Sequence, residues 1–189
     1  TLALKIYECN KDDEWLSSIY PSLVRFFFRW FSEEFDHDMD DFPEWDHPHQ
    51  SGLSESPLYD LWHSNSQFVS IKSIESPALA AMLYRECVAL LKIGEICRIN
   101  TDTDALNEKL SHLAQNIEAC WHKGQNRFFY RDFANHSSSS GKDLGVFKAG
   151  KHKLDARFSE PTRLVLHLTF SGQETRPLSI TISGSNKKG

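Results

Sequence analysis

The chain has 189 residues, of which 40% are hydrophobic and 25% are charged, and its formal net charge at pH 7 is −5. This composition is typical of one globular domain or slightly more. The negative charge gives no electrostatic basis for binding nucleic acid or an anionic membrane. No apolar run reaches the roughly 18 residues that a membrane-spanning helix needs. We therefore expect neither a nucleic acid nor a membrane as partner.

The first predicted element is a helix over residues 13 to 35, because large apolar side chains recur there at helical spacing. They are Trp15, Ile19, Leu23, Phe26, Phe27, Trp30 and Phe31. Pro21 lies inside this pattern and should kink the helix or restart it, because proline lacks the backbone N–H of an intrahelical hydrogen bond.

An acidic loop, DHDMDDFPEWDHP from Asp36, follows this helix and places six acidic residues within eleven. Asp36, Asp38 and Asp40 alternate like the first three ligands of a calcium loop, and Glu44 could add a fourth oxygen. The full EF-hand motif would need glycine at 41 and glutamate at 47, which are aspartate and histidine here. Three interpretations stay open: a Ca²⁺ site, a solvated acidic helix end, or a loop that contacts sugar directly.

Two further helices are predicted to form an αα-hairpin. The first begins at Ser76-Pro77, where serine caps the helix and proline suits its first turn, and it fades near Ile99. The second is capped by Thr103 or Asp104 and has an apolar face.

After residue 124 the periodicity changes. Residues 127–131 are predicted to form a short strand, and the later sequence alternates as strands do. We expect a helical part over residues 1–134, a flexible linker over 135–150 and an antiparallel, sandwich-like β-rich module over 151–189. The chain begins with threonine and ends in a polar tail, so we expect it to be a piece of a longer protein.

The four cysteines show no metal-type spacing. Three of them lie in helical patterns, where cysteine behaves as a small buried hydrophobe. The four cysteines are Cys9, Cys87, Cys97 and Cys120. Reduced thiols in a cytoplasmic protein are therefore expected, because disulfides form in oxidising compartments.

The order of four motifs resembles a known glycoside hydrolase family. They read DHDMDDFPEW, SGLSESPLYDLW, IESPALAAMLYRECVALLKIGE and CWHKGQNRFFYRDF. Together they are similar to the (α/α)6 toroid of processing α-glucosidase I and its bacterial relatives, with trehalases as more distant cousins. In that group D-x-D-G-x-P-E-W precedes S-G-x-D-N-S-P-R-Y-D, V-D-L-N-A-x-L-Y and W-x-x-x-x-G-F-Y-Y-D. The likeness covers roughly residues 14 to 133, and it implies that the chain is mainly α and forms part of such a toroid.

The resemblance implies inverting hydrolysis of α-linked glucosides or related oligosaccharides, in which one carboxylic acid protonates the leaving oxygen and a carboxylate activates water. The acid position of the family is Ser54 here, and Glu55 is the neighbouring carboxyl that could replace it. The base would lie outside this chain. Two hairpins cannot close a six-hairpin toroid, so the rest of a longer polypeptide or an oligomer is an expected partner.

The resemblance also implies residues on the substrate side of the pocket. These are Glu44, Trp45, Tyr59, Asp60, Trp62 and Glu75. Packing roles are open for Trp45 and Trp62. Because Ser54 is no acid, a catalytically inactive carbohydrate-binding or scaffold protein with the same fold is the alternative.

Overall fold

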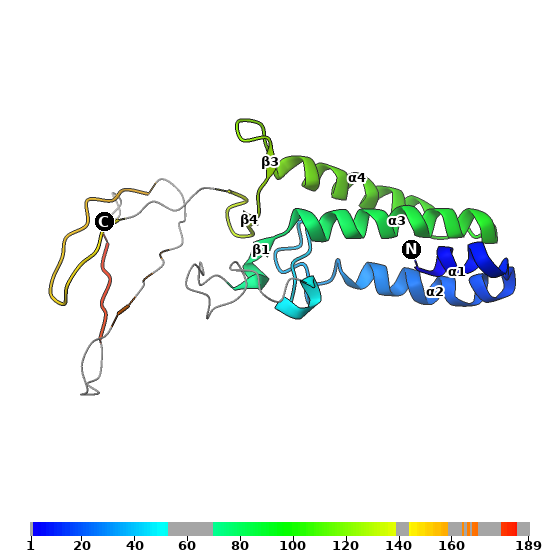
Figure 1. The fold of residues 1–189 in the computed structure, drawn as a ribbon, viewed down its shortest axis with the longest axis horizontal. Coiled ribbons are helices and arrows are strands. Elements are labelled where there is room, and N and C mark those ends of the chain that lie inside the picture. Colours follow the sequence, from blue (N-terminus) through cyan, green and yellow to red (C-terminus); the bar gives the residue numbers. More distant parts are fainter. Residues whose placement is uncertain are drawn as a thin grey trace.

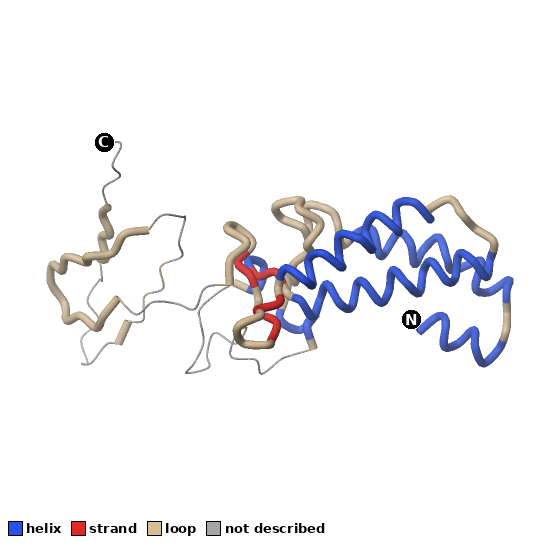
Figure 2. The backbone as a smooth tube through the Cα atoms, turned by 90° about the horizontal axis from the view of Figure 1, so that it is seen from above, coloured by secondary structure: helices blue, strands red, loops and turns tan. Residues whose placement is uncertain are grey.

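The structure is a computed structural model that describes residues 2–52, 70–138, 144–158, 164, 166, 168–169 and 179–184. It contains four α-helices: α1 (Leu2–Asn10), α2 (Asp13–Arg29), α3 (Pro77–Cys97) and α4 (Thr103–Ala119). The helices run side by side in an elongated bundle, with short strands and loops gathered at one end (Figures 1 and 2). None of the helices among the described residues is long and apolar enough to span a membrane.

The strands are short and antiparallel. β1 (Ile74–Glu75) pairs with β4 (Arg131–Asp132), and β2 (Trp121–His122) pairs with β3 (Arg127–Phe128). The predicted mainly helical chain with a small antiparallel β part is thereby confirmed. The single strand expected over residues 127–131 is wrong, because its two ends belong to different pairs.

Local sequence signals explain where the helices begin. The Asp12 carboxylate accepts the Trp15 N–H at 2.9 Å at the start of α2. Ser76 accepts the Leu79 N–H at 3.4 Å at the start of α3, as predicted. The cap expected at Thr103 or Asp104 is wrong: Asp102 precedes α4 and makes no cap bond through its side chain. Its carboxylate instead accepts the Thr101 hydroxyl at 2.9 Å.

α2 is shorter than predicted. It ends at Arg29, and residues 30–35 form turns, whereas the apolar pattern predicted a helix to 35. It also continues through Pro21 without restarting. Its buried face, made of Leu16, Tyr20, Val24 and Phe27, packs on both sides of the proline, so tertiary packing offsets the lost hydrogen bond.

The hydrophobic core lies between α2, α3 and α4, and the predicted αα-hairpin is formed by α3 and α4. Leu16, Leu106 and Leu113 have no exposed surface. Two short 3₁₀-helices flank the end of the bundle that carries the acidic loop: η1 (Pro48–Ser51) and η2 (Ile71–Ser73). The described cysteines are all free thiols, as expected.

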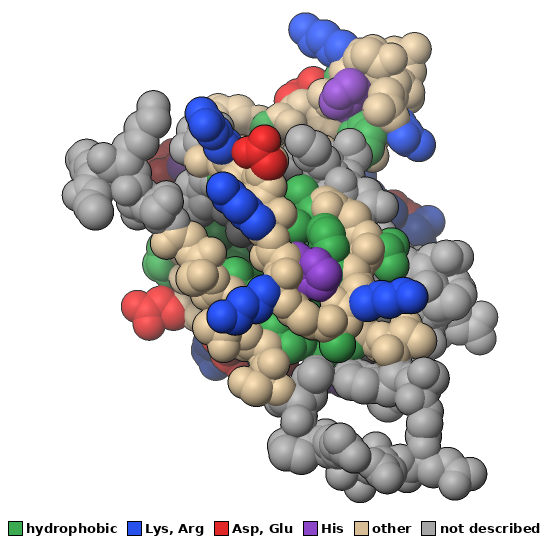
Figure 3. All heavy atoms as spheres, turned by 90° about the vertical axis from the view of Figure 1, so that its left-hand side faces the viewer, with side chains coloured by type: hydrophobic (Ala, Val, Ile, Leu, Met, Phe, Trp, Pro, Cys, Tyr) green, Lys and Arg blue, Asp and Glu red, His purple; other side chains and the backbone are tan. Residues whose placement is uncertain are grey.

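The described residues beyond 143 form no assigned strand. Several apolar side chains among them are exposed, including Val146, Phe158 and Ile182. Figure 3 views the molecule from the end that carries this segment, where Lys and Arg side chains lie at several places on the surface. The β-rich module over 151–189 and the linker over 135–150 stay predictions.

Gly94 should be required for helix packing. A Cβ at this position would lie 2.9 Å from the Ile99 carbonyl oxygen and 3.1 Å from the Tyr20 hydroxyl. We therefore expect Gly94→Ala to lower the free energy of unfolding by about 1–3 kcal/mol, although replacing glycine by alanine inside a helix usually raises it. Urea unfolding measures the change, with exposed Glu95→Ala as control. A stabilised Gly94→Ala protein would contradict the close approach of α2 and α3.

Candidate functional site

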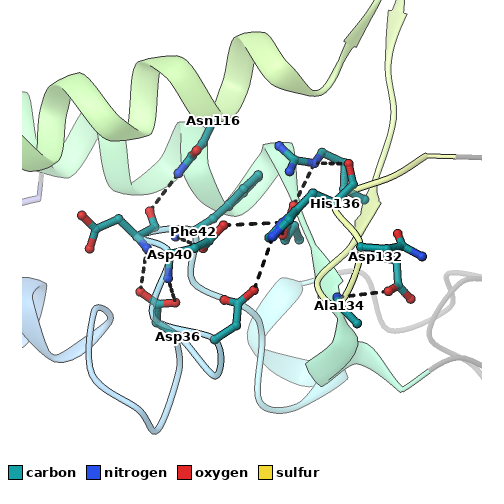
Figure 4. Close-up of polar contacts among 12 residues, drawn as sticks. Asp36, Asp40, Phe42, Asn116, Asp132, Ala134 and His136 are labelled. Carbon is teal, nitrogen blue, oxygen red and sulfur yellow. Dashed lines mark hydrogen bonds and ion pairs between the residues drawn. The ribbon is translucent and has the colours of Figure 1, made fainter. Parts of the chain in front are cut away.

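Acidic side chains gather where the acidic loop meets β1, β4 and the turn that follows β4. We call the group Asp38, Asp40, Glu75 and His136 the acidic site (Figure 4). One ligand atom from each residue lies within 4.8 Å of the others. Glu75 has no exposed surface, whereas the other three residues are exposed. The site is therefore an open rim of two aspartates and a histidine above a buried glutamate.

Asp36 builds the turn that presents this rim. Its side chain is buried, and its two carboxylate oxygens accept the N–H groups of Asp40 at 3.1 Å and Asp41 at 3.0 Å. Burial raises the pKa of Asp36 to about 6, although the two backbone bonds act in the opposite direction. Asp40 continues the turn by accepting the Phe42 N–H at 2.8 Å. These bonds close the acidic loop on itself.

Glu75 lies at the centre of the site. Its Oε1 is 2.6 Å from His136 Nδ1, and its Oε2 is 3.0 Å from Arg131 Nε. The contact with Arg131 is close enough for an ion pair but does not have the geometry of a hydrogen bond. Oε2 therefore has no hydrogen-bond donor among the described residues. Burial raises the pKa of Glu75 to about 7, against the opposing effect of His136 and Arg131.

His136 connects Glu75 to the exposed aspartates. Its Nδ1 is 3.6 Å from Asp40 Oδ2, and its Nε2 is 4.0 Å from Asp38 Oδ2. His136 has a positive φ of 49°, in the turn after β4. The Arg131 Nε–H also donates to the His136 carbonyl at 3.1 Å, which fixes this turn over Glu75. Burial raises the pKa of Asp38, and the nearby Asp40 raises it further.

Glu44 is a second buried carboxylate beside Glu75. Glu44 and Glu75 form an isolated antiparallel β-bridge, so their backbones lie side by side. Oε2 of Glu44 accepts the His37 N–H at 3.2 Å and lies 3.0 Å from His37 Nδ1. Its Oε1 is buried and has no hydrogen-bond partner among the described residues. Burial raises the pKa of Glu44 to about 8, so the acid form predominates at neutral pH.

Trp45 lies in the core. Only 5% of its surface is exposed, and its ring meets Trp30 edge to face at 5.6 Å between centroids. This position favours the packing role that the sequence left open over a sugar-stacking platform. Glu55, Tyr59, Asp60 and Trp62, together with Ser54, lie outside the described residues.

The three predicted Ca²⁺ ligands lie in two neighbouring groups of contacts. Both oxygens of Asp36 are engaged by backbone N–H groups, whereas Asp38 and Asp40 join Glu75 and His136. An imidazole among three carboxylates fits Mn²⁺ or Zn²⁺ better than Ca²⁺, which prefers oxygen ligands. Arg131 beside Glu75 already supplies one positive charge. The Ca²⁺ site of Asp36, Asp38 and Asp40 stays a prediction.

Sequence reasoning missed His136 and Arg131. The separation between Glu75 and His136 is 61 residues, and β1–β4 pairing brings them together. The one signal near Arg131 was the motif CWHKGQNRFFYRDF, which contains this residue and resembles a motif of the glycosidase family.

The comparison with protein families decides the class. A family model described as "Mannosylglycerate hydrolase MGH1-like glycoside hydrolase domain" matches residues 1–170. The chain belongs to this family. Searches of curated proteins and of solved structures gave no match. The expected membership of a glycoside hydrolase family is thus confirmed. The acidic site lies within the part of this glycoside hydrolase domain that the family model covers, and the class implies a carbohydrate substrate.

Proposed function

We propose that this glycoside hydrolase domain forms one wall of a sugar pocket in an inverting enzyme for α-linked glucosides or related oligosaccharides. The observation that carries the proposal is the acidic site, where exposed Asp38, Asp40 and His136 lie above buried Glu75. Carboxylates accept hydrogen bonds from sugar hydroxyls, and an imidazole can donate to or accept from them.

The two buried carboxylates support this assignment. Glu44 Oε1 and Glu75 Oε2 lack hydrogen-bond donors among the described residues, and buried polar atoms of this kind are uncommon in native proteins. A substrate hydroxyl that reaches these atoms would supply the missing partner, because a hydroxyl can donate to a carboxylate and accept from a carboxylic acid. Raised pKa values at both residues also fit the acidic side chains of glycosidase sites.

The finer assignment rests on the sequence resemblance. The likeness to the processing α-glucosidase I type suggests a six-hairpin toroid completed by other parts of the protein, with α3 and α4 as one hairpin. By the same likeness the general acid would be at or beside Ser54, and we propose Glu55 for that role. The family description names mannosylglycerate, which is therefore a second substrate to test. Free thiols support a cytoplasmic location as part of the proposal.

Sugar release from α-linked gluco-oligosaccharides and from mannosylglycerate tests this proposal directly. We expect the protein that carries this sequence to release sugar with inverted anomeric configuration, followed by proton NMR, and Glu55→Gln to reduce kcat at least about 100-fold. Glu95→Gln, on the exposed face of α3, is the matched control and should keep full activity.

The alternative is a carbohydrate-binding protein that keeps the fold without turnover, and Ser54 at the acid position is the observation that favours it. Saturable sugar binding without product from either protein would select this alternative. Retained anomeric configuration would contradict inversion, and absence of both binding and turnover would contradict a sugar pocket.

A further inference from the structure

Three side chains of α4 hold a single residue of the acidic loop, Asp41. The Lys109 ammonium pairs with Asp41 Oδ1, and His112 Nδ1 lies 2.5 Å from Oδ2. Asn116 Nδ2 donates to the Asp41 carbonyl oxygen at 2.9 Å. Lys109, His112 and Asn116 are three and four residues apart, so they lie on one face of the helix. We call these three residues the α4 clamp.

Asp41 needs this support because of its backbone conformation. Its φ is +67°, in the left-handed region that glycine adopts without strain and that other residues adopt at a cost. Partial burial pushes the pKa of Asp41 upward, but the bonds from Lys109 and His112 outweigh burial, and the net pKa lies below the usual value. The clamp therefore favours the ionised carboxylate in this strained position.

The clamp reaches the acidic site through the backbone of the loop. The N–H groups of Asp40 and Asp41 are both bound by Asp36, and Asp40 in turn binds the Phe42 N–H. Neighbouring residues 40 and 41 thus point to opposite partners: Asp41 contacts α4, and Asp40 faces His136 (Figure 4). Fixing Asp41 fixes the turn from which the Asp38 and Asp40 carboxylates project.

We propose that Lys109, His112 and Asn116 are positioning residues that act through Asp41 to hold the acidic turn in the conformation that binds sugar. None of the three belongs to the acidic site. Lys109 also lies over the Phe31 ring, with 4.9 Å from Nζ to the centroid, so the same ammonium contacts an aromatic ring of the core and the Asp41 carboxylate. The sugar as ligand rests on the function proposed above, whereas the restraint on the turn does not.

Asp41→Gly removes the contacts of the α4 clamp with the side chain of residue 41 without adding backbone strain. Glycine fits a φ of +67° but offers no carboxylate to Lys109 and His112. We expect amide exchange at residues 40–42 to become about tenfold faster, because local opening of this turn is no longer restrained, while the melting temperature changes little. Sugar affinity measured by calorimetry should fall by about tenfold, since the carboxylates must be ordered on binding.

Lys109→Met and the double variant test whether the two residues act together. Methionine is an unbranched side chain of similar length without the charge, so it removes the ammonium contacts with Asp41 and with the Phe31 ring. The affinity losses of Lys109→Met and Asp41→Gly should be less than additive in the double variant, as expected of contacting residues. Asp41→Asn, which tolerates a positive φ and keeps an acceptor, should recover part of the affinity. Lys92→Met, an exposed lysine of α3, is the control and should bind as the unaltered protein does.

Each outcome decides the proposal. Unchanged amide exchange in Asp41→Gly and Lys109→Met would overturn it, and so would faster exchange with unchanged affinity for a sugar that the unaltered protein binds. Fully additive affinity losses would also overturn it. Faster exchange in a protein that binds no sugar would support the restraint on the turn and count against the proposed function alone.

Discussion

Replacing Glu75 by alanine should lower the free energy of unfolding by about 2–4 kcal/mol at neutral pH, because one partner of a buried ion pair is lost. Glu75 has no exposed surface, and the Arg131 side chain is only 12% exposed. Without Glu75, the Arg131 guanidinium keeps its bond to the His136 carbonyl, at 3.1 Å, and its position over the Phe42 ring, 5.7 Å from the centroid. The expected loss is below the largest known values because this bond remains.

A double-mutant cycle separates the ion pair from the loss of packing. Glu75→Met, Arg131→Met and the double variant keep similar side-chain volumes, and urea unfolding gives their stabilities. The double variant should lose about 1–2 kcal/mol less stability than the two single losses add up to, since it leaves no unpaired charge. Additive losses, or a Glu75→Ala protein within about 0.5 kcal/mol of the unaltered one, would show that the pair contributes nothing.

The stability of the protein should fall as the pH rises from about 5 to about 8, and Glu44 should account for part of this fall. Burial raises the pKa of Glu44 from 4.5 to about 8 in the folded state. Between these values the folded state holds a proton that the unfolded state has released. The stability that Glu44 contributes is therefore fully present below the pKa of the unfolded state, and it is lost as the pH rises through the pKa of the folded state.

Glu44→Gln removes this proton linkage while keeping the shape of the side chain. Between about pH 5 and pH 8, the free energy of unfolding of the variant, measured in urea, should fall by about 1–3 kcal/mol less than that of the unaltered protein. Some dependence should remain, because burial also raises the pKa of Asp36 to about 6 and of Glu75 to about 7. Exposed Glu95→Gln is the control and should follow the unaltered protein. Equal pH profiles for Glu44→Gln and the unaltered protein would contradict a buried acid form.

The helices could be predicted from the sequence because their signals are local. Ser76 and Pro77 mark the start of α3 by their chemistry alone, and apolar spacing follows the face that is buried. α1 was missed, because its nine residues carry no cap signal and little apolar periodicity. The end of α2 was also missed, since Phe31 and Phe35 are buried in turns and continue the apolar pattern of the helix.

The candidate site was predicted by residue type but not by arrangement. Asp38, Asp40 and Glu75 were singled out and do lie together. His136 joins them through a strand pairing between segments that are far apart in the sequence, which helical or strand periodicity does not encode. The α4 clamp was missed for the same reason: Lys109 and Asp41 are separated by 68 residues, and a charged helix face usually contacts solvent.

A calorimetric titration of Asp38→Asn tests the central claim most directly. Asparagine keeps the size of the side chain and removes the charge from the exposed rim of the acidic site, so the fold should be unaffected. We expect the unaltered protein to bind an α-linked gluco-oligosaccharide saturably and Asp38→Asn to weaken this binding by at least about tenfold, since one charged hydrogen bond contributes about 1.5–3 kcal/mol. Equal affinities for the two proteins, with Glu95→Gln as a matched control, would show that sugar does not bind at the acidic site.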